Sequence, residues 1–142
     1  MRKNQQNIQF YEDYYSKEYD FIGDEKYYNY LLSKIYLNFK KPLKILDVGC
    51  GVGALGFFLL RKNPKLKISG IDISKQGVKT AQKNGIDAKV ADIGQKWPFK
   101  SGYFDLVFGQ EIIEHLVNTD FFINESARVL RKDGLFIITT PN

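Results

Sequence analysis

Cysteine, histidine and long apolar runs are all scarce in this chain of 142 residues. The single cysteine, Cys50, excludes a disulfide framework within the chain and favours a reducing compartment. No apolar run approaches the roughly 20 residues that a membrane-spanning helix needs, and residues 1–6 are polar, without the apolar centre of a signal peptide. These absences predict a cytoplasmic protein that does not act in a membrane.

The charge is positive but not concentrated. The chain carries 21 lysines and arginines against 16 acidic residues, a net charge of +5. The basic residues are scattered or lie in short clusters, whereas a nucleic-acid-binding face typically has a dense basic stripe with interleaved aromatics. A solvated lysine-rich surface is the favoured interpretation, and an acidic substrate stays open as an alternative.

Segments of strand and helix character alternate along most of the chain. Strands are expected at residues 44–48, 67–71, 88–91, 104–108 and 134–140, and helices at residues 54–62, 74–84 and 119–130. This alternation predicts an α/β fold with a doubly wound, mostly parallel sheet. Residues 1–42 are expected to form a helical extension that ends at Lys40-Lys41-Pro42, because proline disfavours helix in the residue before it. Residues 43–142 would form the core.

A glycine cluster joins the first expected strand to the following helix. It reads Asp47-Val-Gly-Cys-Gly-Val-Gly53. Glycines allow a tight turn with backbone N–H groups close to a ligand, and a helix start offers further donors. In a doubly wound sheet this crevice binds ligands. Residues 51–56 also match G-x-G-x-x-G, and Asp72 ends the second strand, so an NAD-dependent oxidoreductase stays open on these features alone.

Further motifs separate the alternatives. Asp92 closes the third strand, and after it come Trp97-Pro-Phe, then Phe104-Asp-Leu-Val, then residues 111–116 and 128–135. In this order and spacing the series resembles class I S-adenosylmethionine-dependent methyltransferases, from about residue 43 to residue 142. The resemblance implies a Rossmann-like core and methyl transfer to a small-molecule or RNA acceptor, with O-methylation slightly favoured. A domain that binds the cofactor without turnover is a further alternative.

The resemblance also implies roles for individual residues. The methionine end of S-adenosylmethionine would be surrounded by Asp47, Gly49, Cys50, Gly51 and Gly53, with Gln110 near its amino acid portion. Asp72 would accept from the ribose hydroxyls and Asp92 from the adenine amino group, and Ile73 and Ile93 would flank the adenine ring.

Structural interpretations compete with these roles. Asp47 could satisfy loop amides, Asp72 with Ser74 could serve the start of a helix, and Asp92 could cap a turn. Cys50 is favoured as a small packing residue rather than a nucleophile.

Aromatic residues near the site have similar alternatives. Trp97 is favoured as an anchor between loop and core. Tyr14, Tyr15 and Tyr19 are favoured as helix packing, and the alternative lets one of them close over the cofactor, as N-terminal helices do in similar enzymes.

Glu111, Glu114 and His115 follow the fourth strand. In a helix they would share one side, and two carboxylates with an imidazole suit Mg²⁺ or another divalent metal. The cluster resembles small-RNA 2′-O-methyltransferases, which use it to bind a metal, and equally ubiquinone-biosynthesis O-methyltransferases. Since His115 is the only histidine, the favoured interpretation is a structural motif with His115 facing the acceptor as a catalytic base.

The chain ends soon after the fifth expected strand. Class I methyltransferases usually continue with two more strands and with acceptor-binding elements, so we expect a truncated chain that binds the cofactor with little turnover. The exposed edge of the fifth strand could pair two copies into a homo-oligomer.

Overall fold

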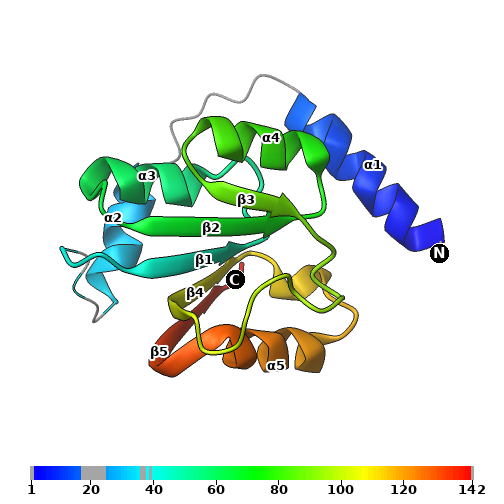
Figure 1. Ribbon diagram of the computed structural model, residues 1–142. Helices are drawn as coiled ribbons and strands as arrows, with labels where there is room; N and C mark the ends of the chain where they lie inside the picture. The colour runs from blue at the N-terminus through cyan, green and yellow to red at the C-terminus, as the bar shows by residue number, and fades with distance from the viewer. Residues whose placement is uncertain (1, 17–24, 36–37, 39, 142) are drawn as a thin grey trace.

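A five-stranded parallel sheet forms the centre of the computed structural model, which describes residues 2–16, 25–35, 38 and 40–141 (Figure 1). The strand order is β3-β2-β1-β4-β5, and every neighbouring pair is parallel. The strands are β1 (Lys44–Val48), β2 (Lys67–Asp72), β3 (Asp87–Val90), β4 (Phe104–Gln110) and β5 (Leu130–Thr139). The doubly wound parallel sheet predicted from the sequence is confirmed.

Helices cover both faces of this sheet. They are α1 (Arg2–Ser16), α2 (Glu25–Ser33), α3 (Ala54–Lys62), α4 (Lys75–Lys83) and α5 (Thr119–Val129), with a short 3₁₀ turn η1 (Ile113–His115). Residues of α2, α3 and α4 share one apolar cluster with Ile45 of β1, whereas α5 and Trp97 share the other with Leu46. Successive strand residues point to opposite faces, so the near-continuous apolar strands are buried on both sides.

Local signals account for the helix boundaries near the site. The Ser74 side chain accepts from the N–H of Gly77 at the start of α4, and Gly85 follows its end with φ +85°, a conformation that favours glycine. The Asn118 side chain accepts from the N–H of Phe121 at the start of α5.

Two expected boundaries are wrong. The N-terminal helical segment does not reach Pro42, because α2 ends at Ser33, whose hydroxyl donates to the Tyr30 carbonyl. β5 begins at Leu130 rather than at residue 134, since Leu130 already pairs with Phe104 and the register then shifts. Asp133, with φ +61°, accommodates this irregularity.

The strand order reverses between β1 and β4. After β1 the chain proceeds outward to β2 and β3, and it then returns to place β4 on the other side of β1. The carboxyl ends of β1 and β4 therefore flank the crevice where doubly wound sheets bind ligands. Within the described part of the chain, no helix is long and apolar enough to cross a membrane.

Candidate functional site at the switch point of the sheet

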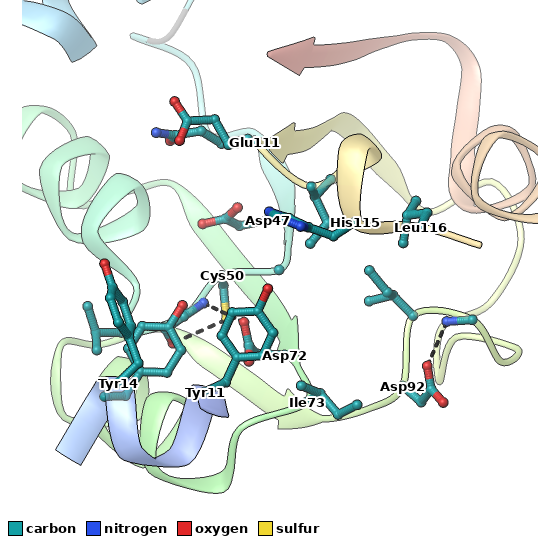
Figure 2. Close-up of a pocket in the computed structure, with 18 of the residues that line it drawn as sticks. Tyr11, Tyr14, Asp47, Cys50, Asp72, Ile73, Asp92, Glu111, His115 and Leu116 are labelled. Atoms are coloured by element: carbon teal, nitrogen blue, oxygen red, sulfur yellow. Dashed lines mark hydrogen bonds between the residues drawn. The ribbon is translucent and has the colours of Figure 1, made fainter. Parts of the chain in front are cut away.

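A cavity of about 790 Å³ lies at the carboxyl ends of the strands. Figure 2 shows labelled residues from α1, from the segments after β1, β2 and β3, and from the segment after β4 around this space. Most of the predicted site residues line it: Asp47, Gly49, Cys50, Gly51, Asp72, Ile73, Asp92, Ile93, Gln110, Glu111 and His115. Gly53 and Glu114 are not among the lining residues.

The glycine loop is tied to the end of β2 by its own backbone. The N–H groups of Gly49 and Cys50 donate to the Ile71 carbonyl at 2.8 and 3.0 Å, and that of Gly51 donates to Asp72 Oδ2 at 2.8 Å. These donors are therefore used internally, contrary to the expectation that they face a ligand. The first turn of α3 has no side-chain cap, so its N–H groups are the better donors toward the cavity.

Glycine is required at positions 49 and 51 both because the backbone has a positive φ there and because neighbouring side chains leave no room for a Cβ atom. Gly49 has φ +74°, and a Cβ there would lie 2.8 Å from Ile112 Cδ1. Gly51 has φ +50°, and a Cβ would lie 2.5 Å from the Tyr15 hydroxyl oxygen. A side chain at either position would therefore displace an element that encloses the cavity.

Asp47 is a buried carboxylate, 4% exposed, at the base of the cavity. Burial, together with the negative charge of Asp72, raises its pKa to about 7. No donor among the described residues bonds this carboxylate, so it does not satisfy loop amides. A buried charge without a partner is unfavourable, and Asp47 therefore suits a cationic ligand group.

Asp72 has both a structural and a cavity-facing role. Its Oδ2 accepts from Gly51 and its Oδ1 from the Ser74 N–H at 2.9 Å, so the helix-start chemistry is present. Burial raises its pKa although these bonds act in the opposite direction. A carboxylate can accept about four hydrogen bonds, which leaves capacity for a ligand.

The segment that carries Asp92 and Ile93 is anchored on α5. Asp92 Oδ1 accepts from Gly94 N–H at 2.9 Å, which matches the turn interpretation, and Asp92 also lines the cavity. Trp97, 2% exposed, donates through Nε1 to the Ile93 carbonyl at 3.1 Å. Glu125 of α5 accepts from the Trp97 N–H at 2.8 Å. Trp97 is thus the anchor between loop and core.

The Glu111-to-His115 segment is not the helix that the metal hypothesis requires. The N–H of Glu111 donates to the Thr139 carbonyl at 2.9 Å, which extends the pairing with β5. Glu111 then has φ +49°, and only the three-residue turn η1 follows. The described residues contain no group of three or more His, Cys, Asp and Glu side chains placed to hold a metal ion. Glu111, Glu114 and His115 are therefore not gathered as expected.

Helix α1 forms a wall of the cavity that the sequence interpretation did not favour. Phe10, Tyr11, Tyr14 and Tyr15 all line the space, and Figure 2 shows Tyr11 and Tyr14 on the same side as Asp72 and Cys50. Burial raises the pKa of Tyr11 and of Tyr15. The high aromatic content of the N-terminal segment was the available signal. Tyr19 lies outside the described residues.

A carboxylate holds α1 in place. Glu12 accepts from the N–H of Lys75 through Oε1 at 2.6 Å and from the N–H of Gln76 through Oε2 at 3.1 Å. Both donors belong to the first turn of α4, where a negative charge is favourable, and Figure 1 shows α1 beside α4. This contact spans 63 residues, and no sequence motif indicated it.

Comparison with known proteins shows which protein family shares this sequence. A family model described as "Methyltransferase domain" matches residues 39–142. The ubiquinone biosynthesis O-methyltransferase of Pelagibacter ubique is 38% identical over 108 residues, 72% of this chain and 43% of that protein. The ajmaline N-methyltransferase of Rauvolfia serpentina is 39% identical over 106 residues, 70% of this chain and 36% of that protein. The chain thus spans less than half of these relatives.

Solved structures share the fold. The PH0226 protein from Pyrococcus horikoshii aligns with a TM-score of 0.71 at 27% identity, over 89% of this chain and 64% of that one. The [4+2]-cyclase SpnF aligns with a TM-score of 0.72 at 24% identity, over 87% of this chain and 48% of that one. Since the same fold carries a named cyclase, the fold alone does not determine chemistry. The family match, however, confirms the resemblance to class I S-adenosylmethionine-dependent methyltransferases, and the chain belongs to the methyltransferase domain family.

Proposed function

We propose that this chain binds S-adenosylmethionine in the cavity at the switch point and takes part in transfer of its methyl group to an acceptor. The observation that carries the proposal is Asp47, a nearly fully buried carboxylate that lines the cavity and accepts no hydrogen bond from the described residues. A ligand with an amino cation supplies the missing partner. A nicotinamide cofactor carries no amino cation, since its adenine and amide amino groups are neutral.

The described residues fit the remaining parts of the cofactor. The first turn of α3 offers N–H donors to its carboxylate. Asp72 has acceptor capacity for the ribose hydroxyls, and Asp92 for the adenine amino group. Ile73 and Ile93 line the same cavity and suit the apolar faces of the adenine ring.

The acceptor would lie on the side of η1. S-adenosylmethionine supplies an activated methyl group on a positively charged sulfur, so the protein has chiefly to align the two reactants and exclude water. His115 lines the cavity and is the candidate base for an acceptor proton. The two relatives described above are named for an O-acceptor and an N-acceptor, so similarity alone supports both. The divalent metal site is not part of this proposal. A cytoplasmic location and pairing of copies through the outer edge of β5 stay predictions.

Calorimetric titration with S-adenosylhomocysteine and with NADH tests the proposal. We expect the first to bind and the second not to bind. Binding of NADH without binding of S-adenosylhomocysteine would contradict the methyltransferase interpretation.

Replacement of Asp72 tests the ribose subsite. Loss of a hydrogen bond to a charged group costs about 1.5–3 kcal/mol, so Asp72→Ala should weaken S-adenosylhomocysteine binding roughly tenfold or more. Because Asp72 also accepts from Gly51 and Ser74, Asp72→Asn serves as a second variant, and a circular dichroism melt checks the fold of both. Unchanged affinity in two folded variants would remove Asp72 from the site.

A further inference from the structure

The charge of the cavity differs from the charge of the chain. The chain has 21 lysines and arginines and a net charge of +5, yet no lysine or arginine is among the described residues that line the cavity. Four carboxylates line it instead: Asp47, Asp72, Asp92 and Glu111. A ligand that carries phosphate or carboxylate groups would meet no cationic side chain on these walls.

The proposed cofactor does not use all of this negative charge, and the inference here rests on that proposed function. Its amino cation would face Asp47, and its neutral donor groups would face Asp72 and Asp92. Its sulfonium and amino cations exceed its single carboxylate by one charge. Glu111 is then a carboxylate at the cavity for which the cofactor provides no partner.

The position of Glu111 connects it to the same end of the cavity as Asp47. Glu111 follows β4, the strand that pairs with β1, and its backbone is held by the bond to Thr139. Tyr28 lines the cavity together with both carboxylates, and burial, with smaller contributions from the charges of Asp47 and Glu111, raises its pKa to about 12. Figure 2 shows Asp47 between Glu111 and the tyrosines of α1.

Aromatic and apolar side chains form a further part of the walls, beside the polar Gln95, Gln110, His115 and Asn118. Phe10 and Tyr14 of α1 are 63% and 43% exposed although they line the cavity. Leu116 and Val117 line it from the segment after η1, and Val117 is fully exposed. Exposed apolar side chains gathered around a cavity favour a flat apolar ligand, and aromatic rings stack on aromatic walls.

We propose that the acceptor is an aromatic compound that bears a protonated amine, with its ammonium group paired to Glu111 and its ring packed between α1 and the segment after η1. This narrows the acceptor to a cationic small molecule. RNA and carboxylate-bearing acceptors are disfavoured, because like charges at short distance repel and the described walls hold no compensating cation.

Two phenols of similar size and opposite charge test the proposal. The protein is first saturated with S-adenosylhomocysteine, and tyramine and 4-hydroxyphenylacetate are then titrated in separate calorimetric runs at low salt. We expect tyramine to bind in the millimolar range or tighter and the acid to show no binding. Glu111→Gln should weaken tyramine binding about fivefold, as loss of a partly solvated ion pair predicts. Asp120→Asn removes the same charge from an exposed residue outside the cavity and should leave tyramine binding unchanged.

The outcomes separate this inference from the proposed function. Failure of S-adenosylhomocysteine to bind overturns the proposed function. If S-adenosylhomocysteine binds and 4-hydroxyphenylacetate binds as well as tyramine, or neither phenol binds, the amine-bearing acceptor is wrong while the cofactor site stands. Equal tyramine affinity of Glu111→Gln and the unsubstituted protein would overturn the role of Glu111. The comparison of the two phenols needs no variant, so it is decisive even if a substitution disturbs folding.

Discussion

Replacing Asp47 with asparagine removes a buried charge while preserving the size of the side chain. The pKa of Asp47 rises from 3.8 to about 7 in the folded protein, which corresponds to at most about 4 kcal/mol. Because the folded pKa is the higher one, the folded protein favours the protonated form of Asp47. The stability that this protonation contributes is fully present below pH 4 and is lost as the pH rises through 7, where the folded protein must bury the charged form. Without ligand, Asp47→Asn should therefore be more stable than the unsubstituted protein at pH 8, and the difference should shrink toward pH 4.

The same substitution should weaken cofactor binding. Asparagine cannot pair with the amino cation as a charged acceptor, so S-adenosylhomocysteine should bind at least tenfold more weakly at pH 8. In the unsubstituted protein the proton and the amino cation compete for Asp47, so affinity should fall as the pH drops below about 7, by at most about tenfold per pH unit. Asp47→Asn should lose this dependence.

Thermal melts of the ligand-free proteins and calorimetric titrations between pH 5.5 and 8 measure both effects. Asp120→Asn, which removes an exposed carboxylate, is the matched control and should retain the pH dependence of binding. The reasoning is refuted if Asp47→Asn binds S-adenosylhomocysteine as tightly as the unsubstituted protein with the same pH profile. A variant that is destabilised at pH 8 would refute the assignment of Asp47 as an unpartnered buried charge.

Two further predictions concern the elements that enclose the cavity. Glu12→Gln should weaken the docking of α1 on α4 by about 1 kcal/mol and lower the affinity for S-adenosylhomocysteine severalfold in calorimetry. Asp13→Asn, at the next residue of α1, is the control and should leave this affinity unchanged. Equal affinities of Glu12→Gln and the unsubstituted protein would show that α1 does not contribute to the site. Arg128→Ala should lower the free energy of unfolding, measured by urea denaturation, by about 3 kcal/mol. The substitution leaves the buried Glu125 carboxylate without its 2.6 Å ion pair. It also removes the hydrogen bonds to the carbonyls of Phe99 and Trp97. Arg128→Lys should restore part of that loss, and full stability of Arg128→Ala would contradict the anchoring role.

Local sequence determined the architecture, and most of the site residues predicted from it line the cavity. Apolar strands with glycine-rich or polar ends alternate with capped helices, and each of these signals depends on neighbours within a few residues, such as Ser74 with Gly77. Parallel strands bring their carboxyl ends to one edge, so the sequence alone predicts that Asp47, Asp72 and Asp92 lie together. Their gathering at the cavity agrees with this expectation.

The tertiary structure decided the features that depend on distant segments. The docking of Glu12 on α4 joins residues 63 apart, and the pairing of Glu111 with Thr139 replaces the expected helix by a strand extension and a short turn. The internal bonds of the glycine loop, and the unpartnered state of Asp47, depend equally on which groups happen to be neighbours in space. A carboxyl group has the same intrinsic chemistry at every position of a sequence. Only its burial and its neighbours in the fold decide whether it caps a helix, as Glu12 does, or has a pKa raised to about 7, as Asp47 does.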